Sequence, residues 1–209
     1  MFAFDRDIDA IRYSEKVLSS ISDRYKIVHS AFSSLSLKLQ EEGISKVDGI
    51  LFDLGVSSPQ LDENRGFSFM RDEVLDMRMN QDDKKTAQDV LNTYSFEELK
   101  TIFYSYGEEK KSSFIASEIV LAREKKPITT TQELCSIILK AVGAKYFYKT
   151  HPERNIFQAI RIEVNNELKE IEKVLPEAIS LLNSGGRLAV ISFHSLEDRI
   201  VKRVFKKYS

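Results

Sequence analysis

The chain has 209 residues, of which 42% are hydrophobic, and its 31 Lys and Arg nearly balance its 32 Asp and Glu. A chain of this length can bury one substantial core and a second, smaller one. No apolar run is long enough to span a membrane. The single cysteine, Cys135, excludes an internal disulfide and a thiolate metal site. Because no secretory leader opens the sequence either, we expect a cytoplasmic protein.

The first third of the chain alternates short strands with helices. Apolar runs predict strands at 1–4 ("MFAF"), 25–29 ("YKIVH") and 47–52 ("VDGILF"). The helix after the first strand is expected to run through Ile11 to Ile21, and Gly43 is expected to stop the second helix. This alternation predicts a right-handed parallel sheet, which binds ligands at the carboxyl ends of its strands.

From about residue 80 to 150 the strand pattern disappears and helix starts replace it. Ser95 to Glu98 and Thr130 to Glu133 each fit a capping box. We therefore predict three parts: a first part of an α/β core at 1–79, an inserted helical domain at 80–150, and a second part of the core at 151–209.

The last part returns to alternating elements. One long amphipathic helix is predicted, which Pro176 kinks or divides, with an apolar face formed by Phe157, Ile160, Val164, Leu168, Ile171 and Leu175. Gly185 and Gly186 predict a turn into the strand "GGRLAVISF". The following segment, "HSLEDRIVKRVF", is expected to begin as a loop and continue as a helix.

Polar residues follow the predicted strands where a parallel sheet binds its ligands. Asp5 suits the two hydroxyls of a ribose, and Asp53 suits an amine or a cationic ligand. A helix N-cap is an equally good interpretation of each acid. His194 directly follows the last strand and is expected at the same rim. The three histidines lie far apart in sequence, so no metal site is predicted.

Two groups of basic residues suit the neutralisation of phosphates, although lysines on a solvated helix face are the more ordinary interpretation. The first group lies in the middle of the chain and the second on the last helix: Lys110, Lys111, Arg123, Lys125 and Lys126; Arg199, Lys202, Arg203, Lys206 and Lys207.

Four segments, in order, carry a resemblance to one family. They are "DGILFDLGVSSPQLDENRGFSFMRDEVLDMRMN", "YGEEKKSSFIASEIVLAR", "FQAIRIEVNNEL" and "GGRLAVISFHSLEDRIVKR". Together they resemble the MraW (RsmH) family of bacterial ribosomal RNA methyltransferases over nearly the whole chain. The resemblance implies a Rossmann-like class I methyltransferase sheet with an inserted, RNA-facing helical domain. It also implies S-adenosylmethionine as cofactor, and N4-methylation of a cytidine in the decoding region of small-subunit ribosomal RNA.

The resemblance also implies site residues and partners. Asp5 matches the acid that holds the cofactor ribose, and Phe32, Asp53 and Gln60 match other positions that contact the cofactor. The partner would be small-subunit ribosomal RNA or the assembled small subunit. From their place at the rim, Ser58 and His194 are expected to position the target amine for methyl transfer.

Family members have a further strand and a glycine-rich loop before the point where this sequence begins, and further strands after its end. The resemblance therefore predicts a fragment with an incomplete sheet, in which the inner edges of "MFAF" and "VDGILF" lack a partner strand. Two alternatives remain open from the sequence. One is a non-catalytic, RNA-binding remnant of the family, and the other is a nicotinamide-dinucleotide-binding domain of a dehydrogenase.

Overall fold

The computed structural model describes residues 1–62 and 64–208, except for the side chain of Ser58. The chain is mixed α/β and divides into two compact units. The sheet unit comprises Met1–Gly55 and Asn166–Ser209, and the helical unit comprises Val56–Asn165. The helical unit includes the range 80–150 and extends beyond it at both ends. The domain boundaries given above stay a prediction.

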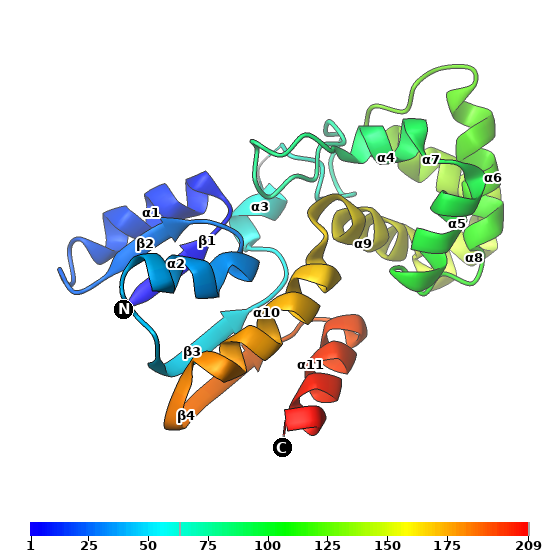
Figure 1. The fold of residues 1–209 in the computed structure, drawn as a ribbon. Helices are drawn as coiled ribbons and strands as arrows, with labels where there is room; N and C mark the ends of the chain where they lie inside the picture. The colour runs from blue at the N-terminus through cyan, green and yellow to red at the C-terminus, as the bar shows by residue number, and fades with distance from the viewer. Residues whose placement is uncertain (63, 209) are drawn as a thin grey trace. The chain divides into compact units, whose positions relative to one another are not determined.

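The sheet unit contains two small parallel sheets (Figure 1). Strand β1 (Phe2–Asp5) pairs with β2 (Lys26–His29), and β3 (Val47–Asp53) pairs with β4 (Leu182–Ile191). The predicted strands and their parallel direction are confirmed. The turn predicted at Gly185 and Gly186 is wrong, because β4 already begins at Leu182 and contains both glycines where its register with β3 is irregular. Among the described residues, β1 and β3 belong to different sheets and do not pair with each other.

Four α-helices and a 3₁₀ turn complete the described part of the sheet unit. They are α1 (Ile8–Leu18), η1 (Phe32–Ser34), α2 (Leu35–Glu41), α10 (Glu167–Leu181) and α11 (Ser195–Tyr208). Gly43 follows α2 with a φ of +73°, as expected for a residue that stops a helix. Helix α1 ends earlier than predicted, so Ile21 lies outside it and is exposed.

One face of the β3–β4 sheet builds the core of this unit. Because side chains alternate along a strand, Phe52 points into a core formed with α2, α10 and α11. That core contains Leu35, Leu39, Phe52, Leu54, Ile171, Val174, Leu175, Ala178, Leu181, Ile200 and Val201. On the strands' other face, Leu51 and Ile191 are exposed.

The helical unit has a separate core. Its helices are α3 (Ser58–Asp62), α4 (Ala87–Thr93), α5 (Phe96–Ser105), α6 (Ser112–Arg123), α7 (Thr131–Val142), α8 (Ala144–Thr150) and α9 (Pro152–Asn165). Both predicted capping boxes are confirmed, at Ser95 and at Thr130, and Thr86 with Asp89 forms a third. The largest side chains buried in this core include Leu75, Met77, Leu91, Phe103, Ile115 and Ile160.

The prediction of one long helix through 157–175 is wrong. The chain forms α9 and α10 with a break at Asn166, whose φ of 52° is left-handed and incompatible with a continuous helix. Pro176 lies inside α10 and does not divide it. The predicted apolar face is consequently shared between two cores, with Phe157 in the helical unit and Ile171 in the sheet unit.

None of the described helices combines the length and the apolar composition that crossing a membrane requires.

The capping box at Thr130 predicts a pH-dependent contribution to stability. A hydrogen bond from Lys126 at 2.6 Å, together with the Thr129 and Thr130 amides, lowers the pKa of Glu133 to about 2. A lowered pKa stabilises the fold above the unfolded value near 4.5, and this stabilisation is lost as the pH falls toward 2. We expect Glu133→Gln to lower the urea midpoint at pH 6, and the difference from wild type to shrink between pH 4.5 and 2.

The control is Glu124→Gln, which changes an exposed carboxylate at the end of α6. It should shift the midpoint little at any pH in this range. A Glu133→Gln difference that stayed constant from pH 6 to pH 2 would contradict the assigned role of the carboxylate.

Candidate functional site

Asp5 ends β1 and is not the cap of the helix that follows. The N-cap of α1 is Asp7, whose carboxylate accepts the Asp9 amide at 3.1 Å. Asp5 Oδ1 accepts the Asp7 amide at 2.8 Å. Although Asp5 still reaches solvent, desolvation raises the pKa of its carboxyl above 3.8 against the opposing effect of that amide. The N-cap alternative is therefore excluded for Asp5. Its carboxylate accepts the Asp7 and Arg6 amides, and a carboxylate has lone pairs enough to accept a ligand hydroxyl as well.

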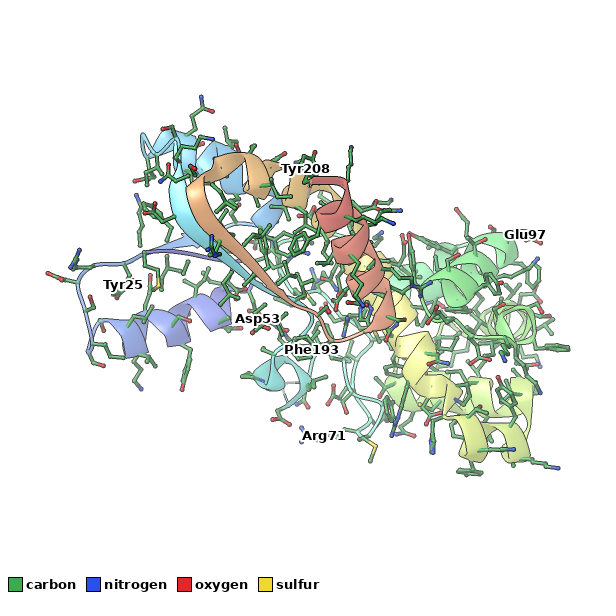
Figure 2. All side chains as sticks on the ribbon, turned by 90° about the horizontal axis from the view of Figure 1, so that it is seen from below. Tyr25, Asp53, Arg71, Glu97, Phe193 and Tyr208 are labelled. Atoms are coloured by element: carbon green, nitrogen blue, oxygen red, sulfur yellow. The ribbon has the colours of Figure 1, made fainter. Side chains whose placement is uncertain are left out.

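Asp53 ends β3 in the same way, and its carboxylate is exposed (Figure 2). The next helix, α3, begins only at Ser58, so Asp53 is not its cap either. Within the described part of the chain, no hydrogen bond or ion pair engages the Asp53 carboxylate. An exposed, unengaged carboxylate at a strand end is a competent acceptor for an amine or a hydroxyl.

Phe32 lies close in the chain to the end of β2. The Ser30 amide donates to the Asp5 carbonyl at 2.9 Å, which fixes the segment leading to Phe32 beside the end of β1. The Phe32 ring packs edge-on against Phe52, with 5.7 Å between centroids. Asp5 and Phe32 thus lie at one end of the β1–β2 sheet, where a carboxylate and an aromatic wall suit a nucleoside.

Gln60 and Ser58 belong to the helical unit. Gln60 is buried, and its Oε1 accepts the Ser57 amide at 3.0 Å, which is one half of a capping box at the start of α3. Ser58 begins α3, but its side chain lies outside the described residues. The placement of Gln60 and Ser58 relative to Asp53 stays a prediction.

His194 caps α11. Its Nδ1 accepts the Glu197 amide at 3.4 Å, and Glu197 Oε2 accepts the Phe193 and His194 amides at 2.8 and 3.3 Å. This is a capping box with histidine as the N-cap residue, and Glu197 at its centre is completely buried. Sequence reasoning missed it because histidine is an unusual cap, although an acid three residues later is the usual pattern.

Glu167, His194 and Glu197 form a cluster of metal-type ligands within the described residues, with ligand atoms within 4.8 Å of one another. His194 Nε2 lies 3.3 Å from Glu197 Oε1. His194 Nδ1 is the ring atom that accepts the Glu197 amide, and the two carboxylates lie close to the same ring. We therefore interpret the cluster as a structural support for the start of α11.

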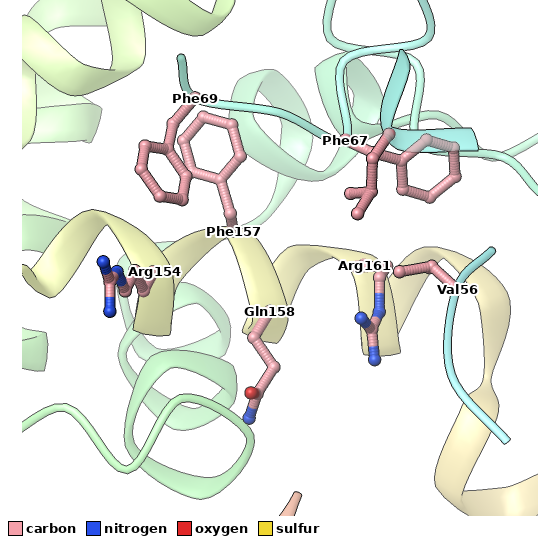
Figure 3. A pocket seen from close by; sticks show the side chains of 8 residues that line it. Val56, Phe67, Phe69, Arg154, Phe157, Gln158 and Arg161 are labelled. Atoms are coloured by element: carbon pink, nitrogen blue, oxygen red, sulfur yellow. The ribbon is translucent and has the colours of Figure 1, made fainter. Parts of the chain in front are cut away.

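The helical unit contains a cavity of about 180 Å³ (Figure 3). Phe157 projects from α9 toward Phe69, and the two rings pack edge-to-face with centroids 5.6 Å apart. Arg154, Gln158 and Arg161 share that face of α9 because they are spaced one helical turn apart. Val56, Leu61 and Phe67 complete the lining.

The irregular segment that carries Phe67 and Phe69 is anchored by hydrogen bonds. Glu73 accepts the Gly66 amide at 2.9 Å, and the Glu73 amide donates to Thr131 Oγ1 at 3.0 Å. Thr131 in turn donates to the Arg71 carbonyl at 2.6 Å. The start of α7 therefore holds one wall of the cavity in place.

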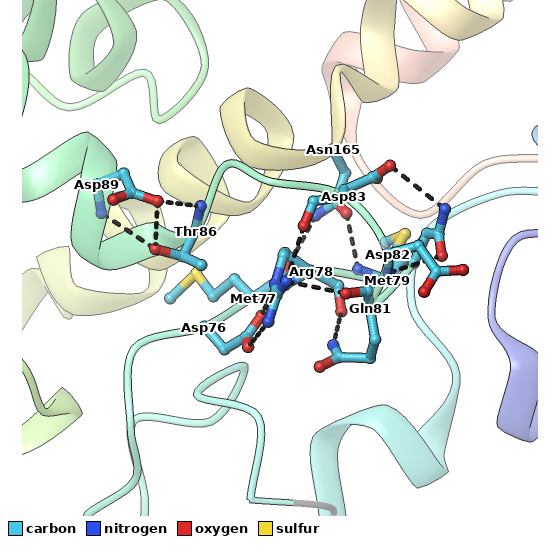
Figure 4. Close-up of polar contacts among 11 residues, drawn as sticks. Asp76, Met77, Arg78, Met79, Gln81, Asp82, Asp83, Thr86, Asp89 and Asn165 are labelled. Carbon is cyan, nitrogen blue, oxygen red and sulfur yellow. Dashed lines mark hydrogen bonds and ion pairs between the residues drawn. The ribbon is translucent and has the colours of Figure 1, made fainter.

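Asn165 anchors the continuation of this segment (Figure 4). Its Oδ1 accepts the Met79 amide at 2.9 Å, and its Nδ2 donates to the Met77 carbonyl at 2.8 Å. Met77 is fully buried with a φ of 60°, a strained conformation for a side chain of its size. Arg78 adds a forked ion pair to Asp76. Burial alone would raise the pKa of Asp76, but the hydrogen bonds from Arg78 outweigh it and lower that pKa below 3.8.

This anchor predicts a stability effect of Asn165→Ala. The substitution leaves a buried amide and a buried carbonyl without their partner, so we expect the free energy of unfolding to fall by about 2 kcal/mol. Hydrogen exchange of the Met79 amide should accelerate in the folded protein. The control, Asn64→Ala at an exposed position, should change stability by less than about 0.5 kcal/mol. Unchanged exchange at Met79 would contradict the anchor.

The His194 cap predicts opposite results for two substitutions. Serine also serves as an N-cap, so His194→Ser should keep the stability of the sheet unit. His194→Ala should lower the free energy of unfolding by about 1 kcal/mol. If urea denaturation showed equal losses for both variants, the ring would act by something other than its capping nitrogen.

A family model described as the MraW methylase family matches residues 1–209, which is the whole chain. The match spans both units and every residue considered above, including Asp5, Asp53 and His194. With acids at the ends of two parallel strands, the match leads to one conclusion. The chain belongs to the MraW methylase family, a family of methyltransferases.

Proposed function

We propose that the chain acts in the S-adenosylmethionine-dependent N4-methylation of a cytidine in the decoding region of small-subunit ribosomal RNA. The observation that carries the proposal is the family match over residues 1–209. Both a methyltransferase and a dehydrogenase would use an acid after an early strand, so Asp5 does not distinguish the two. The family match favours the methyltransferase.

The side chains at the strand ends fit the cofactor. Asp5 offers a carboxylate oxygen to ribose hydroxyls, Phe32 offers an apolar wall, and Asp53 offers an acceptor to an amine. When bound, S-adenosylmethionine would supply an electrophilic methyl group to the N4 amine, with the sulfur as leaving group, and the amine would give up one proton.

The remaining work of the protein is to orient the amine. A cytosine N4 lone pair is delocalised into the ring, so positioning and an acceptor for the departing proton matter most. We keep Ser58 and His194 as the proposed positioning residues. Since Nδ1 of His194 already accepts the Glu197 amide, His194 acts by fixing its loop, and His194→Ser should retain methyl transfer.

Support for an RNA substrate comes from the helical unit. Three aromatic rings line the cavity on α9, and two of them, Phe67 and Phe157, are buried in the core. Arg154 and Arg161 line it as well, and guanidinium groups pair with phosphates and stack on bases. The basic group in the middle of the chain gives weaker support. Lys111 lies over the Tyr146 ring, and Arg123 donates to the Leu91 carbonyl, so both have internal roles.

The test is calorimetric titration of S-adenosylmethionine into the chain, with transfer of a labelled methyl group to small-subunit RNA measured beside it. We expect binding and transfer by the wild type. Asp53→Asn and Asp5→Asn should each weaken cofactor binding about tenfold, because each removes a charged acceptor. The matched control is Asp48→Asn, at the opposite end of β3, where Asp48 accepts from Asn183 at 2.8 Å.

Wild-type binding without transfer would favour the non-catalytic remnant. An Asp53→Asn variant that bound as well as Asp48→Asn would remove Asp53 from the cofactor site. Transfer to another base or atom, identified by mass spectrometry of the digested RNA, would overturn the proposed specificity and leave the methyltransferase activity intact.

A further inference from the structure

Phe193 is a large aromatic side chain exposed at the end of a parallel strand. It follows β4, and 67% of its surface reaches solvent. Its ring lies against Gly55, since a Cβ at that glycine would come within 3.2 Å of Phe193 Cδ2. Gly55 follows Asp53 closely in the chain, and Figure 2 shows Asp53 and Phe193 at the same end of their strands. An uncovered ring therefore lies beside the proposed cofactor acid.

The backbone beneath this ring is firmly held. The Phe193 amide donates to the buried Glu197 carboxylate at 2.8 Å, and the His194 amide donates to the same oxygen. Gly55 has a φ of +87°, a conformation that favours glycine and leaves its ring-facing side flat. A side chain left exposed on so fixed a loop is pre-organised for a flat ligand.

We propose that Phe193 is the platform on which the base of the target nucleotide stacks. The inference deepens the proposed function and rests on it. Proteins recognise single-stranded or extruded bases by stacking them on aromatic rings, because every base has an apolar face. The carboxyl end of β4, next to Asp53, is where a parallel sheet gathers its ligands, so a base stacked there lies beside the cofactor acid.

Phe193 is then a specificity-determining contact. Its loss should weaken the use of RNA as substrate and leave the affinity for the cofactor unchanged. In the full chain, Phe193→Ala should lower kcat/KM for methyl transfer to RNA about 10- to 100-fold, mostly through KM. The dissociation constant for S-adenosylmethionine should stay within about twofold of wild type. Phe193→Tyr should restore transfer, and Phe193→Leu should restore little because it lacks a ring.

Tyr13→Ala is the matched control. It removes an equally exposed aromatic side chain from α1 of the same unit. It should leave kcat/KM and KM for RNA and the dissociation constant for S-adenosylmethionine unchanged. Thermal unfolding of Phe193→Ala should match the wild type, because an exposed ring contributes little to the core. These measurements separate a stacking contact from a structural one.

If the wild type transfers the methyl group, the proposed function holds, and any one of three results would still overturn the inference. They are equal transfer by Phe193→Ala and wild type, loss of cofactor affinity in Phe193→Ala, and failure of Phe193→Tyr to restore transfer. Loss of cofactor affinity would make Phe193 a cofactor contact. Absence of transfer by the wild type would refute the proposed function and this inference together.

Discussion

The buried carboxylate of Glu197 is the interaction on which the rim of the sheet unit depends. One oxygen accepts the amides of Phe193 and His194, and the residue is fully buried. A buried carboxylate is costly without partners, so the loop between β4 and α11 must keep its amides pointed inward. That requirement fixes the backbone after β4, and with it the direction in which Phe193 and His194 point.

Part of the site at this rim can be predicted from short stretches of sequence. The positions of Asp5 and Asp53 follow from apolar runs that end in an acid, and the strands lie where those runs are. The sequence does not distinguish an acid that caps a helix from one that does not. That distinction needed the backbone, which gives the cap of α1 to Asp7 and starts α3 at Ser58.

Other features escaped sequence reasoning for physical reasons. The capping boxes at Ser95 and Thr130 were predictable because their bonds join residues three apart. The break at Asn166 was not, since a single left-handed residue leaves the apolar period almost undisturbed. Phe193 extended an apolar strand pattern, and nothing local indicated that its ring would remain exposed. The role of Asn165 depends on partners far away in the sequence.

The two hydrophobic cores have a consequence for how the protein loses its structure. The buried residues of the sheet unit and of the helical unit form separate clusters. Cooperative unfolding requires that the loss of one part of a core destabilise the rest, and separate cores weaken this link. Denaturation should therefore proceed in two steps with distinct midpoints. A single melting temperature would average two events, and substitutions in different cores should add independently.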